Sequence, residues 1–424
     1  MLQTIRNAWK IEDLRKKIIF TLFIVLLYRI GNAIPVPYVN LTALSQYFTY
    51  LQNTVLGLLD VMSGGAFSNA TIFALSIQPY INASIIIQLL CIAIPALERM
   101  SKDEGEEGKK KIASITRYST VAIGLLQGFA YYMLIKNNSL LTSDGEGVLP
   151  AIVIILTFTS GSALIMWLGE QITEYGIGNG ISIILFASII SRFPTSVIST
   201  IRNIINGSLA WWVALLMYLG ALAIVVLIVF VNDAERRIPV QYAKRVVGRK
   251  MYGGQSTHLP MKVNMSGVMP IIFAQSIASL PATIAAFTGH SDSAWASTSS
   301  IPYAIIYFLL IIFFAYFYST IQFNPVEVAN NLKKNGGYIP GFRPGKPTSE
   351  FIQKVLNKIT LFGALYLGVI ATVPILISVF SSTASLTNLS IGGTSIVIVV
   401  GVALETVRAL EAQMLMRNYK GFLD

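Results

Sequence analysis

The sequence is long, apolar and poor in charge. It has 424 residues, of which 54% are hydrophobic and only 12% charged, and its mean hydropathy is +0.65. Soluble proteins carry about twice that share of charged residues, so this composition excludes a soluble globular fold. The single cysteine, Cys91, excludes internal disulfides, and two histidines far apart make a zinc site improbable, so we expect no metal or cofactor.

Ten apolar segments are candidate membrane spans, because a helix needs about 20 apolar residues to cross the hydrocarbon core. Arg29 interrupts the first segment, and Glu405 and Arg408 follow soon after the last. This pattern predicts an all-α polytopic membrane protein with ten transmembrane helices. In chain order the segments cover residues 18–36, 72–97, 118–135, 148–168, 177–191, 209–231, 268–287, 301–323, 359–380 and 391–404.

Positive charges gather on one side of these predicted spans. Of the 31 Lys and Arg residues, 27 fall in the N-terminal segment, in alternate connections and in the C-terminal tail. Since Lys and Arg mark the cytoplasmic side, both termini are predicted to be cytoplasmic, and we expect no cleaved signal peptide. Ten spans with both ends on one side can divide into two halves, 1–195 and 196–424, of opposite orientation.

The first outer connection contains an apolar segment that is too short to cross a membrane. Residues 55–67 carry one acid, Asp60, and include the glycine pair Gly64 and Gly65. Apolar, non-spanning backbone is stable only against protein, in a cavity or at an interface. The segment is therefore either an interfacial helix on the outer surface or a re-entrant half-helix inside the bundle, with the glycines permitting a sharp turn.

Two long connections on the predicted cytoplasmic side, 232–267 and 324–358, are strongly basic. In the first, apolar and basic residues alternate as in a strand, and Gly253-Gly254 is a turn signal. Attraction to anionic membrane lipid would explain the Lys and Arg residues, but not the glycines and prolines among them. Structured basic loops indicate docking of an acidic or RNA-rich cytosolic partner, including a contact with ribosomal RNA.

The spans are almost free of ionisable residues, which coupled carriers usually keep near the middle of the membrane. No pair of side chains suited to acid–base or nucleophilic catalysis stands out, so we expect a passive conduit and not an enzyme. The glycine-rich segments 341–348 and 176–180 fit neither a P-loop nor a dinucleotide site. A secondary carrier for a small solute and a structural scaffold are the competing classes.

Two long motifs resemble signatures of the SecY protein-translocation channel family. They are residues 73–90, FALSIQPYINASIIIQLL, and residues 167–182, WLGEQITEYGIGNGIS. Residues 236–267, 339–345 and 392–395 resemble further parts of the same family, so the resemblance covers nearly the whole chain. Ser76 departs from the glycine usual in the family, and Leu185 from the isoleucine that is frequent there.

The resemblance implies two five-helix halves, clasped by SecE and accompanied by SecG, around an hourglass-shaped channel. Its waist would be a ring of apolar side chains, and the segment at 55–67 would be a plug resting against the outer side of that ring. Without the resemblance, the six ring residues would be interpreted as ordinary core packing. The ring residues implied here are Ile77, Ile81, Ile181, Leu185, Ile272 and Ile398, and the plug residues are Leu58, Leu59, Asp60, Val61, Met62, Ser63, Gly64 and Gly65.

The resemblance also implies a lateral gate, through which signal sequences of preproteins and membrane helices reach lipid, with Asn82, Gln88 and Gln127 as polar contacts. Unfolded polypeptides would cross a bacterial cell membrane, driven by the SecA motor or by the ribosome. Both drivers would dock on the basic loops, where we expect Arg343 to matter most. The docking residues are Arg236, Arg237, Lys244, Arg245, Arg249, Lys250, Lys333, Lys334, Arg343 and Lys346.

Overall fold

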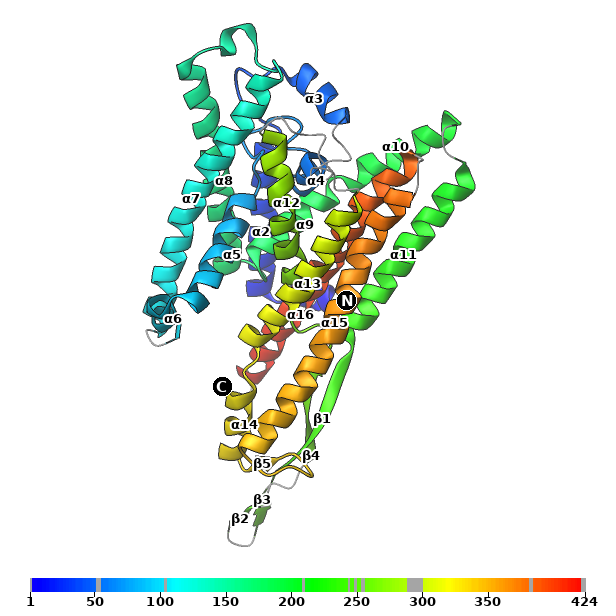
Figure 1. Cartoon of the computed structure of the whole chain (residues 1–424). Coiled ribbons are helices and arrows are strands. Elements are labelled where there is room, and N and C mark those ends of the chain that lie inside the picture. The colour runs from blue at the N-terminus through cyan, green and yellow to red at the C-terminus, as the bar shows by residue number, and fades with distance from the viewer. Residues whose placement is uncertain are drawn as a thin grey trace.

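The computed structural model describes residues 2–50, 55–102, 105–207, 210–242, 245–247, 250–252, 256–287, 300–380 and 384–420. Long helices run alongside one another, and short strands gather at one end of the bundle (Figure 1). The predicted turn at Gly253-Gly254 and the docking residues Lys244 and Arg249 lie outside the described residues.

The first part of the chain is helical, as its apolar segments predict. A long turn-rich stretch separates α4 from α5, and a two-residue turn at Ser191 and Arg192 separates α9 from α10. The elements are α1 (Leu2–Lys10), α2 (Glu12–Gly31), α3 (Leu41–Tyr50), α4 (Val55–Met62), α5 (Gln78–Ala93), α6 (Pro95–Lys102), α7 (Gly105–Asn137), the 3-10 turn Ser143–Gly145, α8 (Val148–Tyr175), α9 (Gly180–Ile190) and α10 (Phe193–Ile205).

The second part contains further long helices and all the described strands. Its helices are α11 (Trp211–Asp233), α12 (Met269–Phe287), α13 (Ile301–Gln322), α14 (Pro325–Lys334), α15 (Lys346–Phe380) and α16 (Ala384–Lys420). Two small antiparallel sheets lie between α11 and α12 and after α14. The strands are β1 (Glu235–Tyr242), β2 (Arg245–Val247), β3 (Lys250–Tyr252), β4 (Ser256–Lys262) and β5 (Gly337–Tyr338).

The strand-like alternation at 232–267 is confirmed. β1 pairs with β4 along its length, with Ile238 opposite Leu259, and β5 adds a short pairing in which Tyr242 faces Gly337. Along β1 the side chains of Ile238 and Val240 are buried while the residues between and before them are exposed. This is the period of two that places one face of a strand on a core.

Every one of the ten predicted spans overlaps a helix. Within the described residues six helical stretches are long and apolar enough to cross a membrane, two of which join neighbouring elements, α9 with α10 and α13 with α14. The helices α5 and α12 are apolar but shorter. The first two predicted spans, 18–36 and 72–97, extend beyond the ends of the helices α2 and α5. α2 ends at Gly31, ahead of Pro35 and Pro37, and residues 72–77 form turns in which Ser76 has a φ of 50°. That backbone conformation favours glycine, which accounts for the glycine usual at this position.

Candidate functional site

A single buried apolar cluster joins helices from both parts of the chain. Five of the six predicted ring residues are buried in it, each at most 4% exposed, and Ile181 is partly buried against it. They come from the start of α5, from α9, from α12 and from α16. The same cluster contains residues outside the predicted ring, such as Ile311 of α13, so burial alone does not separate a ring from general core packing.

The segment at 55–67 is a re-entrant half-helix, and its interpretation as an interfacial helix on the outer surface was wrong. α4 contacts α9, α12 and α16, which brings helices of both parts of the chain against it. Leu56 and Met62 are buried, while Leu58, Leu59 and Val61 are half-buried. The helix ends at Met62 and not at 67, because Gly64 and Gly65 adopt φ values of 69° and 91° that break it.

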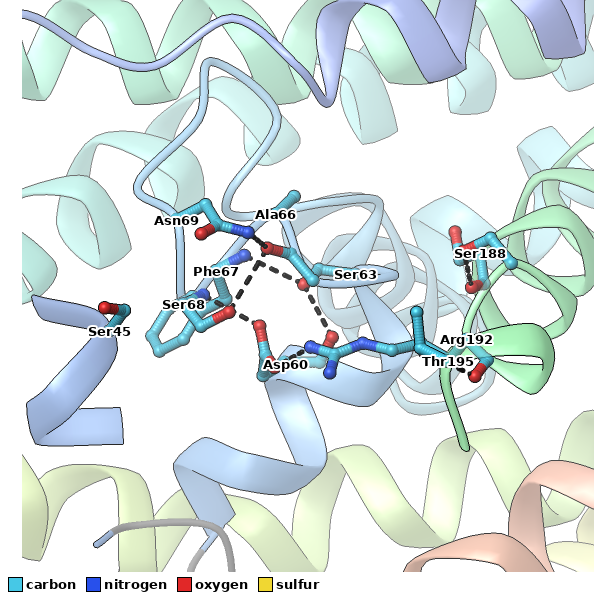
Figure 2. Close-up of polar contacts among 12 residues, drawn as sticks. Ser45, Asp60, Ser63, Ala66, Phe67, Ser68, Asn69, Ser188, Arg192 and Thr195 are labelled. Atoms are coloured by element: carbon cyan, nitrogen blue, oxygen red, sulfur yellow. Dashed lines mark hydrogen bonds and ion pairs between the residues drawn. The ribbon is translucent and has the colours of Figure 1, made fainter. Parts of the chain in front are cut away.

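Asp60 is the polar centre of this segment (Figure 2). It is only 8% exposed, and its carboxylate forms an ion pair with Arg192, which lies at the α9–α10 junction. The other carboxylate oxygen accepts a hydrogen bond from the backbone N–H of Ser68 at 2.7 Å. A carboxylate this deeply buried needs such partners to remain charged. The ion pair therefore joins the half-helix to a connection that is 132 residues away in sequence.

The turn after α4 packs closely on the end of α9. A Cβ on Gly64 would lie 2.9 Å from the carbonyl oxygen of Ser188, and one on Gly65 would lie 3.2 Å from the Arg192 guanidinium. The Tyr28 hydroxyl lies 3.3 Å from the Ser63 carbonyl oxygen, to which it donates, and 2.7 Å from Ser188 Oγ. The glycine pair therefore serves the turn after α4, as predicted, and Gly64 also allows the close approach to the backbone of α9.

Met62 connects the half-helix to two helices that belong to different parts of the chain. Its thioether sulfur accepts hydrogen bonds from the side-chain amides of Gln78 on α5 and Gln275 on α12, each at 3.3 Å. Met62 and both glutamines are at most 9% exposed. The carbonyl oxygen of Gln275 has no hydrogen-bond partner among the described residues. Sequence analysis missed this arrangement, although both glutamines stand out as rare polar residues in apolar segments.

One of the three predicted gate residues bridges two helices. The Tyr318 hydroxyl of α13 donates to the Gln88 side-chain oxygen of α5 at 3.2 Å, and the Gln88 amide donates to Ser84 at 3.0 Å. Asn82 and Gln127 are half-buried, and neither forms a hydrogen bond with another described residue. The structure therefore gives a polar contact between α5 and α13 only at Gln88, among these three.

The two long basic connections share a small core of their own. Ile238, Val240 and Met261 of the sheet are buried together with Ile339 and with Ile352 of α15. α14 begins within the second connection, where the Asn324 side chain accepts hydrogen bonds from the N–H groups of Val326 and Glu327. This core fixes both connections into one body at the end of the bundle (Figure 1).

Basic side chains cover the outside of this body. Arg343 is exposed on a loop between Gly341 and Gly345, whose φ values are 88° and 103°, and its carbonyl oxygen accepts a hydrogen bond from Thr348 at 2.8 Å. The other exposed basic residues of the predicted docking set are Arg236, Arg237, Lys333, Lys334 and Lys346. Arg245 and Lys250 lie on β2 and β3, of which the structure describes only the backbone.

An ion pair at the base of the sheet ties it to α16. Arg408 contacts the Asp233 carboxylate at 2.6 Å and donates to the Asn232 carbonyl oxygen at 2.7 Å. Lys262, at the end of β4, is close by, and burial together with the charge of Arg408 lowers the pKa of its ammonium group. The base of the sheet is thereby joined to α16, the helix that carries Ile398.

Comparison with known proteins identifies the family. The SecY family profile matches residues 71–407. The chain is 45% identical to "Protein translocase subunit SecY" of Streptomyces scabiei and 43% identical to that of Mycobacterium bovis, with both chains covered completely in each case. The chain belongs to the SecY family. It is thus a multi-pass membrane protein and a channel-forming subunit of a protein translocase.

Solved structures agree with this SecY assignment at the level of the fold. One described as "a protein conducting channel" is similar with a TM-score of 0.67 at 17% identity, and covers 94% of this chain and 92% of that one. Sec61 in a canine ribosome–channel complex is similar with a TM-score of 0.62 at 15% identity, with 94% and 92% covered. This similarity confirms the predicted fold class, a mostly helical multi-pass membrane protein with the fold of these channels, but not the exact count of ten spans. The small sheets at one end of the bundle were not part of the predicted fold class.

Proposed function

We propose that the chain passes unfolded polypeptides across the membrane through the ring of Ile77, Ile81, Ile181, Leu185, Ile272 and Ile398, with residues 55–67 as the plug. The observation that carries the proposal is that five of these aliphatic side chains and the plug residue Met62 belong to one buried cluster, against which Ile181 packs. An aliphatic constriction excludes water and ions by dewetting, and it offers no specific bonds that would hold a passing chain. The channel would lie between the halves 1–195 and 196–424.

The proposal is tested by reconstitution of the purified chain, with the subunits that copurify, into vesicles. We expect an unfolded secretory precursor with a signal sequence to become protease-protected inside the vesicles, while the resting vesicles stay tight to ions. A small single-span partner is expected to copurify, as SecE and SecG would, together with a cytosolic ATPase of the SecA kind or ribosomes. Vesicles that instead accumulate a small solute, with no precursor protected, would contradict the proposal.

Met62→Leu is expected to weaken the seat of the plug. Leucine conserves the apolar volume of methionine, but it removes the acceptor that the amides of Gln78 and Gln275 share. Two buried amides would lose a partner, at a cost of about 1–2 kcal/mol to the closed state. The measurement is resting ion leak through single channels in a planar bilayer. Met133→Leu, on the half-buried side of α7, is the matched control and should leave the leak unchanged.

The lateral gate in this proposal opens between α5 and α7 on one side and α12 and α13 on the other. Its polar contacts would be Asn82, Gln88 and Gln127, and the bond between Gln88 and Tyr318 at 3.2 Å supports the second of them. Hydrogen bonds between membrane helices contribute about 0.6–2 kcal/mol, so an apolar signal helix entering the seam could replace one. Such a seam would release signal sequences and membrane helices into lipid.

Gln88→Leu and Tyr318→Phe are each expected to lower the signal hydrophobicity that export requires. Both remove the same hydrogen bond, so their effects should be similar and the double substitution should add little to either. The measurement is the export rate of a precursor series with signal sequences of graded hydrophobicity. We expect the rate for the weakest signal to rise about tenfold. Effects that simply add in the double variant would show that the two residues act separately.

We propose that the basic body of β1, β4, α14 and the loop around Arg343 docks the cytosolic driver. Its fixed, exposed guanidinium and ammonium groups suit the acidic surface of a motor such as SecA, or ribosomal RNA at a ribosome. Six members of this set, named above, are exposed; Arg245 and Lys250 are described by their backbone alone, and Lys244 and Arg249 complete the set in the sequence. In this orientation the sheets and both termini are cytoplasmic, in the plasma membrane of a bacterial cell, where the body also rests on anionic lipid.

Arg343→Glu is expected to reduce motor-driven export by at least about tenfold without loss of folded protein. The charge reversal places a carboxylate at the most constrained point of an exposed loop, and it costs about 1.4 kcal/mol or more in the encounter with an acidic partner. The measurement compares export rate with the yield of monodisperse protein. Lys136→Glu, exposed at the C-terminal end of α7, is the control. An equal loss of export rate in both variants would show that Arg343 is not part of the docking site.

A further inference from the structure

The helix α10 divides cleanly into an apolar and a polar side. At 100° per residue, Phe193, Val197, Ile198, Ile201 and Ile205 fall within one half of the helix circumference. The other half carries hydroxyl and amide side chains together with Arg202, which is the one charged residue of the helix. The polar residues in question are Thr195, Ser196, Ser199, Thr200, Arg202, Asn203 and Asn206.

The described chain leaves most of the apolar side of α10 uncovered, although Val197 is half-buried. Phe193, Ile198, Ile201 and Ile205 are 61%, 52%, 50% and 77% exposed, and no residue of the helix is buried. The helix lies at the end of the bundle opposite to the sheets (Figure 1). The polar side makes α10 a poor fit to the hydrocarbon core, although its first residues continue the apolar stretch of α9, and exposure of its other side to water is also unfavourable.

The helix that follows α10 in the chain, α11, has an apolar and largely exposed surface of the kind that lipid covers. Only 11% of the most apolar stretch of α11 is buried within the described chain. The helix begins at Trp211, and Trp211 and Trp212 are 68% and 58% exposed. Tryptophan at the start of a span marks the boundary between head groups and acyl chains. α10 is therefore connected to the bilayer at the depth where an amphipathic helix is stable.

We propose that α10 lies in the head-group region of the bilayer, with Phe193, Ile198, Ile201 and Ile205 among the acyl chains, and that it holds Arg192 at the membrane surface. Since the helix has a single positive charge, apolar burial and not attraction to anionic lipid drives this contact. The apolar side of α10 thus contacts lipid at the surface of the bilayer, and a zwitterionic bilayer is sufficient for this contact. The inference goes beyond the channel mechanism and requires only that the chain is embedded in a membrane.

The position of α10 has a consequence for the plug segment. Arg192 is the residue that precedes the helix, and its carbonyl oxygen accepts a hydrogen bond from Thr195 at 2.7 Å while its guanidinium pairs with Asp60 (Figure 2). Arg29 of α2 donates to the neighbouring Ser191 at 2.9 Å. Contacts therefore run from the half-helix at 55–62 through the α9–α10 junction to α10, the helix that lies at the membrane surface in this proposal.

Lipid contact is tested on the full chain with its copurifying subunits, reconstituted in phosphatidylcholine vesicles. Cys91→Ser removes the only cysteine, and Ile201→Cys or the matched Ser199→Cys then carries an environment-sensitive fluorophore. We expect nitroxide on the lipid acyl chains to quench the label at 201 and aqueous iodide to quench the label at 199. Equal iodide quenching at both positions overturns the proposal, and so does a label at 201 that neither reagent reaches, because a protein would then cover it.

The link to the plug is tested by a second pair of variants. Ile198→Ser with Ile201→Ser should weaken the seat of α10 in lipid, whereas Ser196→Ala with Ser199→Ala should not. The readout is the rate at which a membrane-impermeant maleimide modifies Ser68→Cys, next to Asp60, in the Cys91→Ser background. We expect a severalfold faster rate only in the first pair. Identical rates in both pairs would refute the link, whatever the fluorescence result, and would leave translocation by the channel untouched.

Discussion

Replacing Arg192 by leucine is expected to make the resting channel leak ions. Asp60, which is 8% exposed beside Arg192, would keep only the N–H of Ser68 as a partner. Breaking a fully buried ion pair costs about 3–5 kcal/mol. Because the Arg192 side chain is 36% exposed, solvent screening reduces the expected cost to about 2 kcal/mol. The closed state would lose that free energy, which raises the open population about thirtyfold. The measurement is single-channel open probability without a precursor.

A double substitution distinguishes the ion pair from simple bulk. Asp60→Leu combined with Arg192→Leu removes both charges and leaves two apolar side chains of similar volume, which proteins often tolerate in place of a buried ion pair. We expect the double variant to leak less than Arg192→Leu alone. Arg29→Leu removes the neighbouring guanidinium, which bonds only to Ser191 among the described residues, and is the charge-matched control. A double variant as leaky as the single one would mean that Arg192 acts by its shape.

Hydropathy predicted the helices well because backbone groups inside a bilayer must pair within the same segment. It failed at the ends of the first two spans, where Val36 donates to the Ala70 carbonyl oxygen at 2.9 Å and the chain turns against protein instead of lipid. It also missed α14. The signal was present there, since Asn324 followed by a proline and an acid is a typical helix start.

The polar partners could not be predicted from spacing along the chain. Arg192 is one of the few charges outside the predicted cytoplasmic segments, and its pairing with Asp60 depends on the packing of α9 against α4. The same holds for Gln275, which lies 213 residues from Met62. Gln88 was identified from the family resemblance, but only the structure supplies Tyr318. Contacts that join distant segments follow from topology, and a single sequence does not contain that information in readable form.

The ring prediction has the largest expected effect on permeability. Ile81→Ser combined with Ile398→Ser places hydroxyl groups on two helices, α5 and α16, that approach the proposed waist from the two halves. Each change reduces apolar contact by about 1.5 kcal/mol or more, so the dewetting barrier should fall enough to raise resting ion flux at least about tenfold per residue. The measurement is ion conductance of the reconstituted chain without a precursor.

The control has to separate a ring from ordinary core packing, since both interpretations place these residues in one buried cluster. Ile311 of α13 is 0% exposed in the same cluster but outside the predicted ring. Ile311→Ser with Ile24→Ser on α2 should destabilise the protein at least as much, because both remove buried methyl groups. We expect that pair to lower the thermal midpoint without raising conductance. If both pairs conduct equally, the leak reflects a loosened core, and the six residues are packing residues and not a waist.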